Sequence, residues 1–498
     1  MNTGECTSPR LLPKLLAGIA ATLLLAGCQP KAPEAPQNLV VICLDTVRYD
    51  AFLQRDVNDA LTPWLDKALL FSDTTSAAPW TMPSVSTVLT GLYPVEHGAG
   101  RFQTQVANLD TELPSPLDPS AVTLAEILDK RHFRTGGFVS HPFFMYDLGL
   151  RQGFQQVHNR RGWQRDEAKF WEWADKIHAP DRFFGYLHFM EAHHRHTQSD
   201  QVLGEFLDKQ DPATLDYLAG LHPRNCADRD SDRCLQNLVY DVSVLELRTA
   251  VATLLNELQK RNLLDKTLVL VYSDHGEEFW DHEAEELKRG GDPRASVGLG
   301  HGQSMYQELL HVPLLVWHPH MQGAVYDTPV SLVDVLPSLL AWMHIDTEDL
   351  HLKLSGMPLP PLRGHHWFGK PKDRTMYASG IAYGPQQVAT RRGTLKSIFH
   401  LQDDSFEFYD LAADPKEQAP LSDSGLVLEF DTVTGDYLDR QPIAQVAASK
   451  LDAKQIESLK AIGYLQGVNE PQEPNAQGEQ APQQAAGEEA HKDGGEQP

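Results

Sequence analysis

The sequence lacks an excess of positive charge. Its 498 residues include 43 Lys and Arg against 68 Asp and Glu, which gives a formal net charge of −25. This balance argues against binding to nucleic acid or to an anionic membrane surface. An acidic enzyme can still bind an anionic substrate where a metal ion supplies local positive charge.

Cysteine is also scarce, with five residues in the chain. Cys43 lies inside an apolar run, so we expect a buried thiol there. Cys226 and Cys234 flank a polar loop and could form a disulfide in an oxidising compartment.

The N-terminus reads as an export signal. Arg10 and Lys14 precede the apolar run 15–25, which is too short to cross a bilayer comfortably. Leu25-Ala26-Gly27-Cys28 follows and resembles the bacterial lipobox, which implies cleavage before Cys28 and diacylation of that residue. Gln29 in place of Asp then implies anchoring to the outer membrane, facing the periplasm or the surface. A plain secretory signal with a chance cysteine is the alternative.

The length predicts one large catalytic domain with a smaller appendage. We expect a signal peptide at 1–27, a tether at 28–37, a main domain at 38–370, a C-terminal subdomain at 371–466 and an acidic tail at 467–498. The tail is rich in Pro, Gln, Glu, Gly and Ala and has almost no apolar residues, so we expect disorder there.

Five apolar runs predict buried parallel strands at residues 38–44, 135–139, 183–189, 267–272 and 312–317. Apolar residues at helical spacing between 244 and 258 predict a helix, and residues 121–128 predict a shorter one. This alternation favours an α/β fold with a doubly wound, mostly parallel sheet flanked by helices. Short alternating runs at 375–381, 387–391, 394–401 and 406–410 predict a smaller antiparallel α+β subdomain.

Carboxylates and imidazoles follow four of the predicted strands. They are Asp45, His141, His193, and the pair Asp274 and His275. Ligands of open α/β sheets bind outside the carboxyl ends of the strands, so these side chains could meet in one crevice. Asp and His supply the oxygen and nitrogen ligands that a divalent metal needs.

Thr81 opens a second motif, because Pro83 fits the first turn of a helix that starts there. Free amides at the start of such a helix would hold a phosphate or sulfate oxygen. A Thr hydroxyl becomes a useful nucleophile when a metal lowers its pKa. The alternative is that Thr81 serves only as a helix cap.

Together these motifs resemble the sulfatase family of the alkaline phosphatase superfamily. Residues 81–91 resemble the signature Cys-x-Pro-Ser-Arg followed by Leu-Thr-Gly, and 38–45, 273–277, 190–193, 300–314 and 408–417 resemble further family motifs. The resemblance implies metal ligands at Asp45, Thr81, Asp274 and His275. It also implies that His141, His193 and His301 contact the substrate, with Thr81, His193 and His301 taking part in catalysis.

The departures from the family pattern concern the nucleophile. Sulfatases use formylglycine made from Cys or Ser, and Thr81 is neither. The signature Arg is Val85, and Asp45-Thr46 stands where sulfatases usually have two aspartates. The set Asp, Thr, Asp and His is similar instead to phosphatase, phosphodiesterase and lipid phosphotransferase relatives, which use a Thr alkoxide on phosphorus.

We therefore expect a metal-dependent hydrolase of phosphate or sulfate esters, with phosphoesters favoured. The substrate would be a lipid headgroup, a glycan or a small molecule. One divalent ion is expected, with Ca, Mn, Zn and Mg not distinguished. A second ion is possible, for which His282 could be a ligand. The alternatives are a phospho-group transferase acting on lipid or glycan acceptors, and a non-catalytic lipoprotein that binds an anionic glycan.

Overall fold

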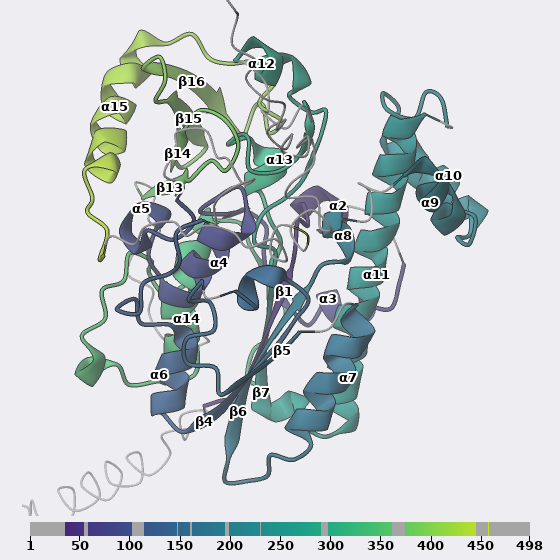
Figure 1. The fold of residues 1–498 in the computed structure, drawn as a ribbon, viewed down its shortest axis with the longest axis vertical. Helices are drawn as coiled ribbons and strands as arrows, with labels where there is room; N and C mark the ends of the chain where they lie inside the picture. Colours follow the sequence, from purple (N-terminus) through teal and green to yellow (C-terminus); the bar gives the residue numbers. More distant parts are fainter. Residues whose placement is uncertain are drawn as a thin grey trace, which may run out of the picture.

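The computed structural model describes residues 35–53, 58–101, 114–146, 148–159, 162–194, 199–229, 231–289, 297–360, 374–444 and 457. An eight-stranded sheet with the order β11-β2-β10-β7-β1-β6-β4-β5 crosses the molecule and has helices on both faces (Figure 1). A separate antiparallel sheet, β13-β14-β15-β16, lies in the C-terminal part. The predicted fold class is confirmed.

The strands of the large sheet are β1 (Asn38–Leu44), β2 (Leu69–Phe71), β4 (Phe133–Val139), β5 (Gln156–Asn159), β6 (Arg182–Phe189), β7 (Thr267–Tyr272), β10 (Leu314–Trp317) and β11 (Ala324–Tyr326). Short ladders join β3 (Thr74–Thr75) to β12 (Val330–Ser331) and β8 (Glu278–Phe279) to β9 (Leu299–Gly300). The principal helices are α4 (Thr81–Thr90), α6 (Leu124–Lys130), α7 (Trp163–Ala174), α9 (Asp200–Leu207), α10 (Pro212–Leu221), α11 (Asp232–Lys260), α14 (Val335–Trp342) and α15 (Ser424–Leu438).

Shorter helical segments connect these elements. They are α2 (Tyr49–Leu53), α3 (Thr62–Leu65), α5 (Pro94–His97), α8 (Glu191–His194), α12 (Glu283–Lys288), α13 (Gln307–Leu310) and four 3₁₀ turns, η1 (Pro142–Phe144), η3 (Leu264–Lys266), η4 (Leu332–Asp334) and η5 (Glu348–Leu350). Within the described ranges, no helix combines the length and apolar content needed to span a bilayer.

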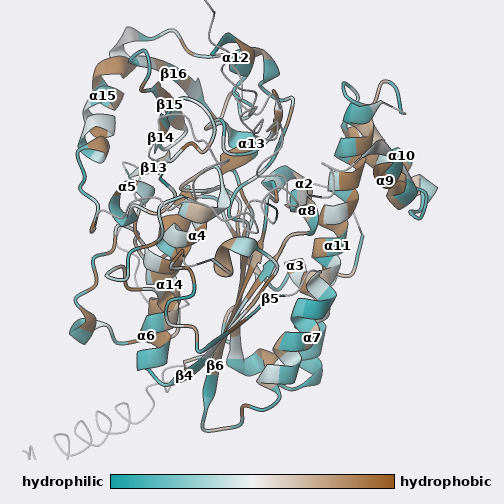
Figure 2. Ribbon diagram, viewed as in Figure 1, coloured by the Kyte–Doolittle hydropathy of each residue, from teal (hydrophilic) through white to brown (hydrophobic). Residues whose placement is uncertain are grey.

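The central strand β1 shows how the sheet is buried on both faces. Successive side chains of a strand point to opposite faces. Leu39, Val41 and Cys43 accordingly pack with α4, α6 and α14, whereas the alternate residues of the strand pack with α7 and α11. Figure 2 shows hydrophobic colouring along these inner strands and hydrophilic colouring on α12 at the surface. An all-apolar run therefore becomes a central strand.

The predicted strand at residues 312–317 is real but runs in the other direction. β10 pairs antiparallel with β7, so the prediction that it is parallel was wrong. The chain leaves β7 at its carboxyl end and enters β10 from that same end, after the short elements β8, α12, β9 and α13. A parallel strand would need a crossover connection back to the other end of the sheet.

The C-terminal sheet is formed by β13 (Thr375–Ser379), β14 (Gln387–Arg392), β15 (Leu395–His400) and β16 (Ser405–Asp410), with α15 beside it (Figure 1). Its apolar residues Ala389, Ile398 and Tyr409 share one buried cluster with Met305 and Tyr306 of the large domain. The small sheet therefore packs against the segment that follows His301.

A buried ion pair joins the small sheet to this segment. Lys396 Nζ of β15 lies 2.7 Å from Glu417 Oε1, and the two side chains are 1% and 0% exposed. Lys396 also donates to the carbonyl of Met305, and Glu417 accepts from the backbone N–H of Gln307.

We predict that Lys396→Met lowers the free energy of unfolding by about 3 kcal/mol or more, because it leaves a buried carboxylate without its cation. Urea titration measures this loss, and Lys396→Met combined with Glu417→Gln should recover much of it; a neutral single substitution contradicts the assignment.

A second contact gives a dependence on pH. The pKa of His282 is raised to about 9, since burial lowers it but the Glu308 carboxylate, 2.7 Å away, and the Glu417 carbonyl more than offset that effect. The folded pKa lies above the unfolded value, so this stabilisation is present below about pH 6.5 and is lost as the pH rises through 9. We predict that the wild type loses about 3 kcal/mol more than His282→Gln over this range. Denaturant unfolding at pH 6 and pH 9.5 tests this, and parallel pH profiles would contradict it.

Candidate active site

The candidate residues converge at the carboxyl ends of four neighbouring strands. Asp45 follows β1, His141 follows β4, His193 lies on α8 after β6, and Asp274 and His275 follow β7. The pairing Cys43↔Tyr272 brings the ends of β1 and β7 side by side. All five of these side chains are buried.

Two carboxylates form the base of the site. Asp45 Oδ2 accepts a hydrogen bond from His188 Nε2 at 2.8 Å, and Asp274 Oδ1 accepts from the His275 backbone N–H at 3.0 Å. Asp45 Oδ1 and Asp274 Oδ2 have no hydrogen-bond partner although both are buried. Burial, and after it the charge of Asp274, raises the pKa of Asp45 well above its usual range. Unpartnered buried carboxylate oxygens fit a bound cation.

His275 turns one ring nitrogen toward these carboxylates. Its Nδ1 lies 2.9 Å from the carbonyl oxygen of Gly276 and donates to it, which leaves Nε2 as the nitrogen with a free lone pair. His275 Nε2 is 3.6 Å from Asp45 Oδ1 and 3.5 Å from Asp274 Oδ2. Asp45, Asp274 and His275 therefore form one group whose ligand atoms could hold a metal ion.

Thr81 contacts this group from a different element, the start of α4. It is the first residue of α4, and the cap position is Trp80, whose side chain makes no capping hydrogen bond. The interpretation of Thr81 as only a helix cap was therefore wrong. The Thr81 hydroxyl lies 3.2 Å from His275 Nε2 and is fully buried. A hydroxyl in this place can donate to the imidazole or, once deprotonated, attack a bound ester.

The start of α4 is fixed to the end of β7. Ser84 Oγ donates to the carbonyl of Asp274 at 2.7 Å, and Ser76 Oγ contacts the same carbonyl. On its other side the same loop packs closely on α13, which Gly276 permits because a Cβ there would lie 1.9 Å from the carbonyl oxygen of Glu308. The distance between Thr81 and the carboxylates is thus set by backbone contacts.

Three further imidazoles surround this group. His301 Nδ1 lies 3.0 Å from Glu277 Oε1, and its ring centre is 4.5 Å from that of His275 and 4.9 Å from that of His193. His141 Nε2 is 3.9 Å from Asp45 Oδ2, and burial, followed by the charge of His188, lowers the pKa of His141. The structure thus places Thr81 and the six other candidates for catalysis, substrate contact and metal binding in one buried cluster.

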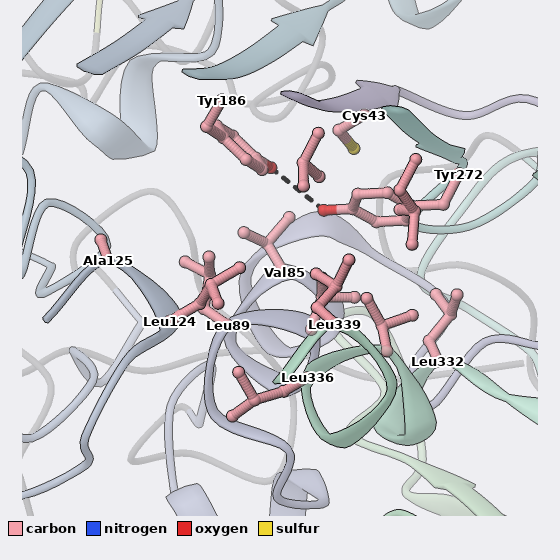
Figure 3. Close-up of a cluster of buried hydrophobic side chains, with 14 of the residues drawn as sticks. Cys43, Val85, Leu89, Leu124, Ala125, Tyr186, Tyr272, Leu332, Leu336 and Leu339 are labelled. Carbon is pink, nitrogen blue, oxygen red and sulfur yellow. Dashed lines mark hydrogen bonds between the residues drawn. The ribbon is translucent and has the colours of Figure 1, made fainter. Parts of the chain in front are cut away.

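His188 and the residues behind it had no signal in the sequence. His188 is the second-last residue of the apolar strand β6 and is fully buried, and burial lowers its pKa to about 4. Its Nδ1 contacts the hydroxyl of Tyr186 at 3.3 Å, which in turn lies 3.1 Å from the hydroxyl of Tyr272 (Figure 3). Cys43 is a free, buried thiol beside these tyrosines. This chain of polar groups fixes the ring that holds Asp45.

Val85 occupies the position of the signature Arg. Its side chain is fully buried and belongs to the same apolar cluster as Leu89 and Leu339 (Figure 3). This position therefore supplies no charge to the pocket.

The remaining candidate residues lie elsewhere. His282 contacts Glu308 and the Glu417 carbonyl, and it stacks on Tyr306 with ring centres 3.7 Å apart. It belongs to none of the groups of possible metal ligands found among the described residues. Cys226 and Cys234 form a disulfide, as predicted, which ties the segment before α11 to the first turn of that helix. Cys28 lies outside the described residues.

The comparisons agree with this geometry. The family model described as Sulfatase matches residues 37–345. Choline-sulfatase from Rhizobium meliloti is 26% identical over 218 residues, which are 44% of this chain and 39% of that protein. An ulvan-active sulfatase from Formosa agariphila is 23% identical over 379 residues, covering 66% of this chain and 68% of the relative. The chain spans only 37% of human arylsulfatase K, again at 26% identity.

A solved structure with the same fold is the phosphonate monoester hydrolase of Agrobacterium radiobacter. It superposes with a TM-score of 0.58 at 17% sequence identity, covering 81% of this chain and 94% of that one. The family match extends over more than half of the chain and includes every strand that carries a candidate ligand. The chain belongs to the sulfatase family of the alkaline phosphatase superfamily.

Proposed function

We propose that the protein is a metal-dependent hydrolase of phosphate or sulfate esters, with phosphoesters favoured and Thr81 as the nucleophile. The observation that carries this proposal is the position of the Thr81 hydroxyl. It lies 3.2 Å from His275 Nε2, and His275 forms a buried group of possible metal ligands with Asp45 and Asp274. A nucleophile beside a set of anionic and neutral ligands is the arrangement that metal-assisted ester hydrolysis requires.

Asp45, Asp274 and His275, together with Thr81, would hold one divalent ion. The unpartnered oxygens Asp45 Oδ1 and Asp274 Oδ2 support this, since burying two carboxylates without a cation is costly. A bound ion would lower the pKa of the Thr81 hydroxyl and offset the negative charge of the ester. The same two oxygens argue against the alternative of a non-catalytic binding protein.

The preference for phosphoesters follows from the nucleophile. Thr81 cannot be converted to formylglycine, so the aldehyde hydrate that sulfatases use is not available to this chain. Val85 stands where sulfatases have the Arg whose positive charge supports that hydrate. A Thr alkoxide is the nucleophile of the phosphatase relatives that the sequence resembles, and the phosphonate monoester hydrolase shows that this fold also occurs in a phosphorus-ester enzyme.

The reaction proceeds in two displacements. Thr81 Oγ attacks phosphorus, the bond from phosphorus to the leaving alcohol breaks, and the phosphoryl group is carried on Thr81. His301, whose ring is oriented by the 3.0 Å contact with Glu277, and His193 beside it are placed to protonate the leaving oxygen. Water then attacks phosphorus while the same imidazole, now deprotonated, takes a proton from it; the bond from phosphorus to Thr81 Oγ breaks, and the Thr81 alkoxide and the imidazolium are both restored. His141 faces the same pocket and can donate to a phosphoryl oxygen.

The nucleophile is tested by removing its hydroxyl. We predict that Thr81→Ala lowers kcat on an aryl phosphate ester by about a thousandfold or more, while Thr81→Ser keeps substantial activity because it retains a hydroxyl. Steady-state rates with aryl phosphate monoester, phosphate diester and sulfate substrates measure this. Thr90→Ala is the matched control, since its hydroxyl bonds to Ser86 O at the far end of the same helix. Equal rates for Thr81→Ala and the wild type would exclude Thr81 as the nucleophile.

The metal is tested by a measurement independent of turnover. We predict that chelation abolishes activity and lowers Tm by a few degrees, because an ion at 100 times its Kd stabilises the folded state by about 2.7 kcal/mol. Re-adding Mn²⁺, Zn²⁺, Ca²⁺ or Mg²⁺ one at a time should restore Tm in the wild type but not in Asp45→Asn. Asp241→Asn is the control, as Asp241 is equally buried but pairs with His222. A Tm that responds to no metal contradicts the proposed site.

A further inference from the structure

A second cavity lies beside the active site, between the large domain and the C-terminal sheet. Its volume is about 390 Å³. It is lined by Gln303 and Ser304, by Gln387 and His400 of the small sheet, and on the remaining side by Glu278, His282, Glu285, Glu286, Lys288 and Arg289. We call it the interdomain cleft. None of the residues assigned to the reaction lines it.

Three side chains of the interdomain cleft carry polar atoms without a partner. They are Gln303 Oε1, Ser304 Oγ and Gln387 Oε1. The side chains belong to residues that are only 4%, 4% and 7% exposed. Burying a hydrogen-bonding group without a partner is unfavourable, and native structures rarely keep several together. These atoms fit a ligand that completes their hydrogen bonds.

The charges of the cleft indicate which ligand fits. Within the described lining, every cation is already paired: Lys288 with Glu285, Arg289 and His400 with Glu407, and His282 with Glu308. Glu278 is fully buried, and its carboxylate accepts from Gln303 Nε2 at 2.9 Å. Burial, and after it the charges of Glu308 and Glu286, raises the pKa of Glu278. An anionic ligand would find no free cation here, whereas a ligand with O–H or N–H donors would find acceptors.

The interdomain cleft and the active site share one wall. Two consecutive carboxylates hold alternate residues of the same loop: Glu277 contacts His301 at 3.0 Å, and Glu278 contacts Gln303 at 2.9 Å. The carbonyl of Gly302, between them, accepts from the amides of Ala382 and Tyr383 of the small domain. A group bound in the cleft therefore lies against the loop that carries His301.

We propose that the interdomain cleft binds an uncharged or amine-bearing sugar ring. The amide oxygens of Gln303 and Gln387, with Glu278, accept from its hydroxyl or amino groups, and Ser304 completes the set. Resting on the proposed function, this ring is the part of a glycan ester that does not carry the transferred group. A sulfated or phosphorylated ring belongs in the active site and not in the cleft.

The test measures sugar binding directly, without turnover. Saturation-transfer NMR is recorded on the full chain carrying Thr81→Ala, with D-glucose, D-glucosamine or choline added singly. We expect signals from both sugars and none from choline, whose quaternary ammonium has no N–H donor and whose single hydroxyl can satisfy only one of the acceptors. Gln387→Leu and Ser304→Ala should each weaken sugar binding about fivefold, the effect of one hydrogen bond. Gln236→Leu is the matched control, because Gln236 also has an unpartnered amide oxygen but lies on α11.

Two outcomes would overturn the inference. One is the absence of signal from both sugars. The other is equal sugar signals in the wild type and in both cleft variants, with Tm showing that each variant is folded. Choline binding that is lost in the cleft variants would replace the sugar with a cationic ligand. Because the assay needs no hydrolysis, failure of the proposed reaction would leave its result unchanged.

Discussion

The arrangement of the candidate active site depends on two carboxylates that are buried side by side. Asp45 and Asp274 lie at the ends of adjacent parallel strands, and neither is exposed. Burial and their mutual repulsion both oppose the ionised state, which is why the pKa of Asp45 is raised. Hydrogen bonds satisfy one oxygen of each carboxylate and leave the other oxygen open. A bound cation would offset this repulsion, whereas burial lowers the pKa of both His141 and His188 and so disfavours their charged forms.

The backbone after Asp45 is strained to keep this arrangement. Thr46 has a φ of 61°, which is rare for a β-branched residue and costs on the order of 1–3 kcal/mol. The hydroxyl of Tyr240 donates to the Thr46 carbonyl and accepts from the Arg48 N–H, while Ser273 Oγ accepts from the Val47 N–H. These contacts from α11 and from the residue that follows β7 offset the strain. They turn the chain sharply after β1 and leave the Asp45 carboxylate facing His275.

The central strands were the features best predicted from the sequence, because a strand covered on both faces needs an unbroken run of apolar residues. The runs at 38–44 and 267–272 coincide with β1 and β7, because continuous apolar residues are what a strand covered on both faces requires. The residues after strand ends meet because parallel strands share one carboxyl edge. The direction of β10 could not be predicted, since strand direction depends on the connection and not on composition. Short strands such as β2 and β11 carry too few residues to show a period.

Contacts between residues that lie far apart in the sequence were also not predicted. His188 reads in sequence as one polar residue in an apolar strand, and only its 2.8 Å contact with Asp45, 143 positions away, gives it a role. Gln303, Ser304 and Gln387 likewise have no local pattern, because their shared cavity exists only after the small sheet packs on the large domain. Pairs of this kind are set by tertiary packing, so residue spacing carries no information about them.

The departures at Thr81 and Val85 have one physical explanation. Val85 points from α4 toward the sheet, on the side of Cys43 and Tyr186, where an Arg would be a buried cation in an apolar core (Figure 3). An aldehyde nucleophile gains from such a cation, because the charge supports its hydrate. The proposed Thr81 alkoxide would depend instead on the carboxylates and imidazole at the strand ends. With Thr81 as the proposed nucleophile, no aldehyde hydrate forms that would need the Arg, and an apolar residue at that position packs the helix onto the sheet at lower cost.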